Sequence, residues 1–364
     1  MSTKRTKWRF FRQCGFCLFL IGLFGMGHFV PSSGRPIIGQ IKSVWYIGWD
    51  KSAYASAQTY SELSTLKTRL QVNAVGLLVP LFQEGLRSNN PHRDTNRTPT
   101  DAQVRRVIDQ AHALGLQVIL LPYLISDDGR WVGELAPENT PQWFKRWRAL
   151  LLPYAALAHD TGTEIFLIGW EFETLLPETE EWEKTISAVR ENYGGFVSYI
   201  TNFWANPEEY QRVLDWEPWE LLDFIGLSAY FELARHENPS VEELRRAWHH
   251  DANGQDVIAN LAELNEQYGR CLVLWELGYE SKEGTTQFPW DFERPGVPDE
   301  GEQSRAFLGT FQSLGREAWF AGYSIWSQEM GLRKTEIGYD VLGKLAELTI
   351  RTNQLESRTC QDAR

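Results

Sequence analysis

The chain has 364 residues, 43% of them hydrophobic, and a formal net charge of −12. Its first 35 residues hold six of the 36 basic residues and none of the 48 acidic ones, so the remainder carries a net charge of −18. A body this acidic repels phosphate backbones, which argues against nucleic acid as a partner. The length and the apolar content permit one large barrel domain.

Residues 1–35 are predicted to form a signal peptide or a membrane anchor. Five cations precede Cys14–Val30, a run of 17 residues that contains no charged side chain. As a helix this run reaches about 25 Å, which is marginal for a membrane span and long for a signal peptide. No clear cleavage site follows it. Both alternatives predict export: the body is membrane-anchored and faces outside the cytoplasm, or it is secreted or periplasmic.

The cysteines allow one disulfide. Cys14 and Cys17 lie within the apolar run, so their CxxC spacing does not indicate a metal or redox site. Cys271 opens a predicted strand and Cys360 lies in a polar tail. These two could pair in an oxidising compartment, although their settings do not favour it.

Residues 36–350 alternate between strand and helix patterns, and a polar tail follows at 351–364. A helix is expected after Thr98-Pro99-Thr100-Asp101, with an end at Gly115. Eight strands joined by helices predict an α/β fold, a single (β/α)8 TIM barrel. No glycine-rich phosphate fingerprint follows the first strand, which argues against a dinucleotide-binding sheet. The predicted strands are Ser43–Gly48, Ala74–Pro80, Gln117–Leu121, Glu164–Trp170, Phe196–Ile200, Asp223–Leu227, Cys271–Glu276 and Trp319–Trp326.

Two of these strands, the fourth and the seventh, end in a glutamate beside a tryptophan, at Glu171 and Glu276. Barrel enzymes present catalytic side chains from the carboxyl ends of their strands, so both acids are expected at one mouth. The prediction assumes that Glu171 shares an inward face with Leu167 and Gly169. It also assumes that Glu276 shares an inward face with Leu272 and Leu274. The alternative is that each acid only forms an ion pair at a strand end.

Other chemistries have little support. No HExxH motif, no Cys/His ligand spacing and no GxSxG elbow occur, so neither a metal nor another cofactor is expected. His112, in the middle of a predicted helix, is interpreted as a packed or surface residue.

Several stretches resemble glycoside hydrolase family 113, the β-mannanases of clan A. Beyond the helix start and Gly115 described above, the resemblance rests on motifs in the same order as in that family: Trp143-Phe144 with Tyr154-Ala155, Ile168-Gly169-Trp170-Glu171, Asp223-Phe224-Ile225-Gly226 with Ala229-Tyr230-Phe231, and Trp275-Glu276-Leu277-Gly278-Tyr279.

The resemblance implies a retaining hydrolase of a β-linked, mannan-like polysaccharide or oligosaccharide, with Glu171 as acid/base and Glu276 as nucleophile. It also implies substrate-binding roles for other positions: Tyr230 beside the nucleophile, Asn202 after the fifth strand, Trp326 under the cleaved sugar, Trp131 in the loop after the third strand, and Tyr123 at the end of that strand. Glu173 shares a face with Glu171, and we expect it to bind substrate or to form an ion pair.

The chain departs from the family pattern near the expected sugar site. Trp170 and Trp275 replace small polar residues before the glutamates, Tyr123 replaces a histidine, Ser228 an aspartate and Val132 an arginine, and Glu232 stands where proline is common. We therefore expect the chemistry to be kept and the sugar preference to differ. The alternative function is a non-catalytic glycan-binding barrel of an envelope polysaccharide system.

Sixteen tryptophans are a high count, and sugars stack on aromatic rings. Two groups are expected. The first packs inside the protein: Trp143, Trp147, Trp182, Trp216, Trp219 and Trp248. The second lies near the mouth, where a ligand could touch it: Trp45, Trp49, Trp131, Trp290 and Trp326.

Overall fold

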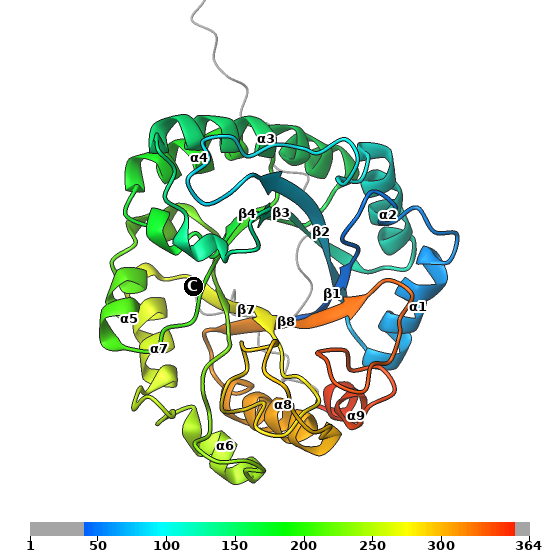
Figure 1. Ribbon diagram of the computed structural model, residues 1–364, viewed down its shortest axis with the longest axis vertical. Helices are drawn as coiled ribbons and strands as arrows, with labels where there is room; N and C mark the ends of the chain where they lie inside the picture. The colour runs from blue at the N-terminus through cyan, green and yellow to red at the C-terminus, as the bar shows by residue number, and fades with distance from the viewer. Residues whose placement is uncertain (1–39, 354–364) are drawn as a thin grey trace, which may run out of the picture. The chain divides into compact units, whose positions relative to one another are not determined.

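The computed structural model describes residues 40–353, so the predicted export segment and most of the polar tail lie outside the described residues. Eight parallel strands close into a barrel in chain order (Figure 1). Each strand begins within two residues and ends within five residues of its predicted limits. They are β1 (Ile41–Ile47), β2 (Ala74–Gln83), β3 (Gln117–Ser126), β4 (Ile165–Trp170), β5 (Phe196–Thr201), β6 (Phe224–Ser228), β7 (Cys271–Leu277) and β8 (Phe320–Glu329).

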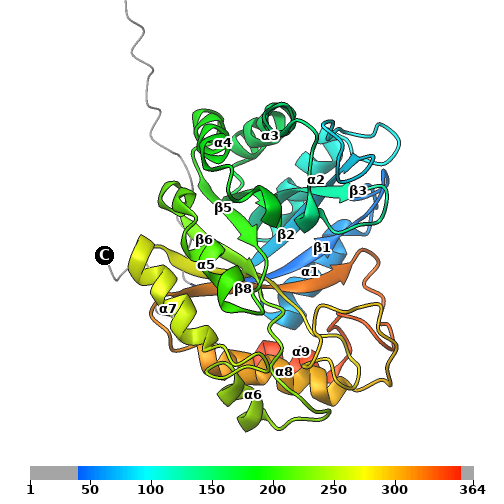
Figure 2. The ribbon, with the colours of Figure 1, turned by 60° about the vertical axis from the view of Figure 1, so that its left-hand side comes forward.

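Helices surround the barrel (Figures 1 and 2). They are α1 (Thr59–Leu70), α2 (Asp101–Ala113), α3 (Thr140–Thr161), α4 (Thr179–Asn192), α5 (Pro207–Leu214), α6 (Val241–Ala247), α7 (Val257–Tyr268), α8 (Glu300–Leu314) and α9 (Leu345–Thr352). The start of α2 is as predicted: the side chains of Thr100 and Gln103 form a capping box. Gly115 follows the helix with φ +70°. The TIM-barrel prediction is therefore confirmed for the described part of the chain.

Two buried clusters separate the inside of the barrel from its outside. The inner cluster includes Ile165, Leu167, Val273 and Trp275. The outer one, between strands and helices, includes Leu272 and Leu274 as well as the six tryptophans predicted to pack, all of which are buried. Trp45 also belongs to the inner cluster and is fully buried, so it is a core residue and not a ligand platform at the surface.

The predicted side-chain parity is wrong in both glutamate-bearing strands. Leu272 and Leu274 face the helices. A Cβ on Gly169 would meet Tyr199 and Phe172, so Gly169 also faces outward. The reason is one extra residue in each strand. Leu167 and Trp170 pair with Ser198 and Ile200 of β5, while Leu274 and Glu276 pair with the adjacent Leu227 and Ser228 of β6. Such β-bulges re-aim the side chains that follow them.

Two further findings concern the described residues. No helix within residues 40–353 combines the length and the apolar character needed to cross a membrane. Cys271 is disulfide-bonded, which the sequence allowed but did not favour. The other three cysteines lie outside the described residues.

Candidate active site

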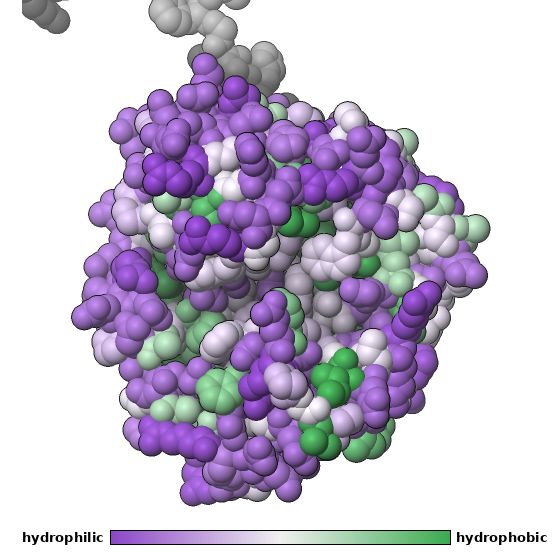
Figure 3. Space-filling view, in the orientation of Figure 1, coloured by the Kyte–Doolittle hydropathy of each residue, from purple (hydrophilic) through white to green (hydrophobic). Residues whose placement is uncertain are grey.

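Glu171 and Glu276 meet at the carboxyl ends of the strands. Glu171 directly follows β4 and Glu276 is the sixth residue of β7. They are 4% and 2% exposed, and burial and then the charge of Glu171 raise the pKa of Glu276. The face of the barrel seen in Figure 1 is hollowed at its centre, with pale to hydrophobic residues inside the hollow and hydrophilic ones around it (Figure 3). The structure therefore brings the two predicted acids into one site.

The backbone aims Glu171. Its φ is +50°, a left-handed conformation that non-glycine residues adopt infrequently, and its N–H donates to the carbonyl of Ile200 at 2.7 Å. Outliers of this kind collect at functional sites because the surrounding structure has to hold them. The indole N–H of Trp131 donates to Glu171 Oε2 at 2.7 Å, so the predicted Trp131 contacts the acid itself.

Glu276 has one bonded and one free oxygen. The hydroxyl of Tyr230 donates to Oε2 at 2.9 Å, as predicted for that tyrosine. Glu276 Oε1, Ser228 Oγ and Trp170 Nε1 are buried and make no well-aligned hydrogen bond among residues 40–353, although Ser228 and Trp170 lie near enough to the two carboxyls to lower their pKa values. Buried polar atoms are rarely left unpaired, and a cluster of them in one place indicates a site that a ligand completes.

Burial dominates the ionisation of the pair. Burial, opposed by Ser228 and Trp131 and aided by the charge of Glu173, raises the pKa of Glu171 to about 7. The pKa of Glu276 is raised well above its ordinary value, first by burial and then by the charge of Glu171, with Tyr230 and Trp170 opposing. Two coupled buried carboxyls do not readily ionise together, so the pair keeps one proton near neutral pH.

Glu173 and Asn202 form a second polar element beside Glu171. Glu173 accepts hydrogen bonds from the hydroxyl of Thr201 at 3.1 Å and from the backbone N–H of Asn202 at 2.8 Å. Burial raises the pKa of Glu173 to about 7, against these donors and the nearby Arg212. It makes no ion pair at contact distance within the described chain, so it remains available to accept a sugar hydroxyl.

Four aromatic rings line another part of the mouth: Trp49, Tyr123, Trp170 and Trp326, which we call the aromatic group. Tyr123 lies 4.3 Å from Trp170 between ring centroids and 6.3 Å from Trp326, nearly parallel to the latter. Trp49 meets both Tyr123 and Trp326 edge-on, and Trp45 contacts Trp326 from the core. These rings come from β1, β3, β4 and β8 and the segments that follow them. They include the predicted Trp326 and Tyr123.

Three residues of the site were not predicted from the sequence. Trp170 was expected to face away from the acids, but the bulge in β4 turns it onto Tyr123. Ser228 was noted only as a departure from the family pattern. Tyr339 packs edge-on against Tyr230 at 6.2 Å, and the charge of Glu276 helps to raise its pKa. Nothing near Tyr339 in the sequence indicated this, because it comes from the loop after β8.

Two other residues considered in the sequence, Trp275 and His112, have structural roles. Trp275 packs inside the barrel core, where its indole N–H donates to Ser198 Oγ at 2.9 Å. His112 bonds the buried Glu164 at 3.1 Å, before the start of β4 and away from the acids. Within residues 40–353 no group of three or more His, Cys, Asp or Glu side chains could hold a metal.

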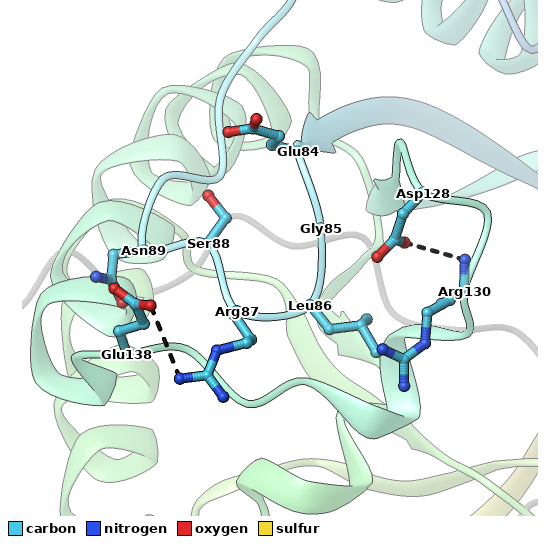
Figure 4. A pocket seen from close by; sticks show the side chains of 9 residues that line it. All are labelled: Glu84, Gly85, Leu86, Arg87, Ser88, Asn89, Asp128, Arg130 and Glu138. Carbon is cyan, nitrogen blue, oxygen red and sulfur yellow. Dashed lines mark hydrogen bonds and ion pairs between the residues drawn. The ribbon is translucent and has the colours of Figure 1, made fainter.

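A second hollow, of about 400 Å³, lies beside the loops after β2 and β3 and is lined by the side chains shown in Figure 4. Its two arginines are already paired: Arg87 with Glu138 at 3.7 Å, and Arg130 with Glu134 at 2.7 Å. None of its lining residues belongs to the acid pair or the aromatic group, so we do not assign the reaction to it.

A closed (β/α)8 barrel with two buried, coupled glutamates after β4 and on β7 is the arrangement of a glycoside hydrolase. The chain belongs to Glycoside Hydrolase Family 113, whose family model matches residues 44–344. The resemblance found in the sequence is confirmed, and so is the prediction of a glycoside hydrolase.

Solved structures agree with this assignment. The GH113 β-mannanase from Alicyclobacillus acidocaldarius is 26% identical with a TM-score of 0.76, over 87% of this chain and 98% of that one. Another GH113 β-1,4-mannanase, at 22% identity and TM-score 0.76, covers 86% and 98% and shares the fold. An endo-β-1,4-mannanase from Thermotoga petrophila is more distant, at 13% identity and TM-score 0.53, over 91% and 79%. No curated protein sequence matches the chain.

Proposed function

We propose that the protein is a retaining glycosidase that hydrolyses a β-1,4-linked, mannan-like chain, with Glu276 as nucleophile and Glu171 as acid/base. The observation that carries the proposal is the position of these two buried carboxyls at the carboxyl ends of β4 and β7, where the charge of Glu171 acts on Glu276. The substrate class follows from the β-mannanase activity named for the Alicyclobacillus acidocaldarius relative. Retention requires carboxyls about 5–5.5 Å apart, close enough for one to attack while the other protonates.

The first step forms a covalent glycosyl-enzyme. Glu276 Oε1, the oxygen without a partner, attacks the anomeric carbon as the glycosidic C–O bond breaks. Glu171 gives its proton to the departing oxygen. Tyr230 supports this division of roles: its own pKa is raised well above the ordinary value, so its hydroxyl stays protonated and stabilises the Glu276 carboxylate.

The second step returns the enzyme to its starting state. Glu171, now ionised, takes a proton from a water molecule, and the resulting hydroxide attacks the same anomeric carbon and releases Glu276. A pKa of about 7 suits a group that must donate a proton in one step and accept one in the next. The nearly parallel rings of Tyr123 and Trp326 offer a face on which the cleaved sugar can stack.

Product analysis tests the proposal. Wild-type protein should hydrolyse mannopentaose, and proton NMR of the first product should show the β anomer. Glu276→Gln should lose turnover by at least about a thousandfold, since no nucleophile remains. The control is Glu164→Gln, another buried glutamate at the opposite end of β4, which should keep activity. An α-anomeric first product, or normal turnover by Glu276→Gln, would contradict the assignment.

We further propose that the protein is exported. The cationic and apolar segment before residue 36 and the disulfide-bonded Cys271 support this, since disulfides persist in oxidising compartments. Fractionation of the native host, with mass spectrometry of the protein's N-terminus, tests both export and cleavage. Recovery of the intact, fully reduced protein from the cytoplasm would contradict the proposal.

A further inference from the structure

A cleft of about 480 Å³ lies beside Glu171, where Trp131 and Glu173 line it, and no ring of the aromatic group belongs to its lining. Its lining comes from helix α5 and from the loops after β3, β4, β5, β6 and β7, and includes Trp131, Glu173, Asn202, Glu232 and Trp290. None of the lining residues belongs to β1, β2 or β8 or to the loops that follow them. The volume lies within the ~300–1,000 Å³ range of small-ligand sites. We call it the leaving-side cleft.

The position of Glu171 relative to the aromatic group determines which part of a substrate would enter this cleft. The sugar attacked by Glu276 stacks on the aromatic group, on the side of β1, β3 and β8. Glu171 protonates the oxygen that links this sugar to the next one. The next sugar must therefore lie beyond Glu171, where Trp131 and Glu173 open the cleft.

Two exposed tryptophans stand in this cleft, each fixed by a carboxylate. Trp131 is 41% exposed and its N–H is bound to Glu171; Trp290 is 45% exposed and its N–H donates to Glu232 Oε1 at 3.2 Å. Glu232 is held in turn by the amide of Asn253 at 3.3 Å. An exposed ring that is already immobilised loses little conformational freedom when a sugar stacks on it.

Polar groups in the same lining are available to a ligand. The side-chain amide of Asn202 and the guanidinium of Arg212 have no hydrogen bond or ion pair within residues 40–353. Arg212 is the lone basic residue of the lining. Of the four carboxyls in the lining, Glu134 is paired with Arg130, while Glu173, Glu209 and Glu232 make no ion pair within residues 40–353. Mixed donors and acceptors suit hydroxyl groups, while the excess of carboxyls repels an anionic sugar.

We propose that the leaving-side cleft binds uncharged sugar units on the departing side of the bond, and that Trp290, locked by Glu232, is the anchor for a unit beyond the first. This rests on the proposed function. Trp290 and Glu232 are thus specificity-determining residues: they favour substrates that continue past the cleaved bond and disfavour chains with a uronate there.

Two substrates of different length isolate the cleft. β-Mannobiosyl fluoride has a single fluorine as leaving group and leaves the cleft empty, whereas mannopentaose can extend into it. Trp290→Ala should lower the ratio of kcat/KM for mannopentaose to kcat/KM for the fluoride by about tenfold. Glu232→Ala should lower the same ratio by about threefold, since the ring remains but is no longer held. The control is Phe292→Ala in the same loop, 68% exposed and outside the cleft, which should leave the ratio unchanged.

Transfer reactions give an independent measure. With the fluoride as donor, mannobiose should accept the glycosyl group, and Trp290→Ala should lower the yield of transfer product about tenfold. A uronate-ended disaccharide should be a poor acceptor for the wild type. If Trp290→Ala changed neither the ratio nor the transfer, or if the uronate acceptor matched mannobiose, the inference would be overturned.

Failure of the hydrolase assignment would give a different result from failure of the cleft proposal. If the wild type consumed neither substrate, the hydrolase assignment would fall, and calorimetry of mannopentaose with wild type and Trp290→Ala would still test the cleft. Weaker binding to the variant would support the cleft, and equal binding or none would refute it.

Discussion

The hydrogen bond from Tyr230 to Glu276 gives a prediction that separates mechanism from packing. Tyr230→Phe removes one oxygen and leaves the buried ring. Glu276 then loses the donor at 2.9 Å from Oε2, in a site where its other oxygen already has no partner in the described chain. A hydrogen bond to a charged group contributes about 1.5–3 kcal/mol. The carboxylate of the variant should be less stable than that of the wild type by about this amount.

The sign of the pH effect follows from which form is stabilised. Tyr230 bonds the ionised form, so its removal raises the pKa of Glu276. The acid limb of the kcat/KM profile should therefore move to higher pH, by about one to two pH units, and kcat/KM below that limb should fall about tenfold or more.

The assay is the pH dependence of kcat/KM for β-mannobiosyl fluoride, followed with a fluoride electrode. Tyr339→Phe is the matched control, because its hydroxyl donates to the carbonyl of Pro289 at 2.6 Å and not to the acid pair. An acid limb that stays in place in Tyr230→Phe, or moves equally in both variants, would refute the role given to Tyr230.

Three further predictions concern the acids and the barrel closure. Azide should restore activity on the fluoride-type or aryl donors to Glu171→Ala, because it replaces the base in the second step, but should not restore Glu173→Ala. Glu171→Gln should raise the free energy of unfolding near pH 8 by up to about 3 kcal/mol and leave it unchanged near pH 4. The reason is that burial penalises only the ionised carboxyl, whose pKa is about 7 in the folded protein. Denaturant titration at both pH values measures the difference. Gly322→Ala should destabilise the protein by several kcal/mol in thermal unfolding, because φ at Gly322 is +145° and the new Cβ would lie 2.0 Å from the carbonyl oxygen of Ile41. The control is Gly129→Ala: φ there is +73° and the space around it is open, so the change should cost only about 1–2 kcal/mol.

Much of the fold was predictable because barrel strands are buried on both faces. Each reads as a short apolar run, and the helices between them carry local start and stop signals, such as Thr100 and Gly115. The two acids could be singled out for the same reason: a carboxylate directly after such a run has to sit at a strand end. The division of the tryptophans into packed and mouth groups also held, except for Trp45, whose run alone cannot distinguish core from mouth.

The orientation of side chains at the mouth could not be predicted. Simple alternation placed Gly169 inside and Trp170 outside, and the structure reverses both. A bulge depends on how two strands pair, and no residue within β4 or β7 indicates it. The bulges in these two strands come immediately before Glu171 and Glu276, so the elements that turn both acids into the site are the ones that alternation misses.

The amino-acid sequence by itself thus determined the barrel, the acidic body and the two strands that end in acids, because local apolar runs and turn signals suffice for these. Tertiary structure decided which groups surround the acids: Tyr339 comes from the loop after β8, and Trp290 meets Glu232 across 58 residues of chain. Such contacts join loops that only the closure of the barrel brings together, and for that reason they leave no pattern in the order of the residues.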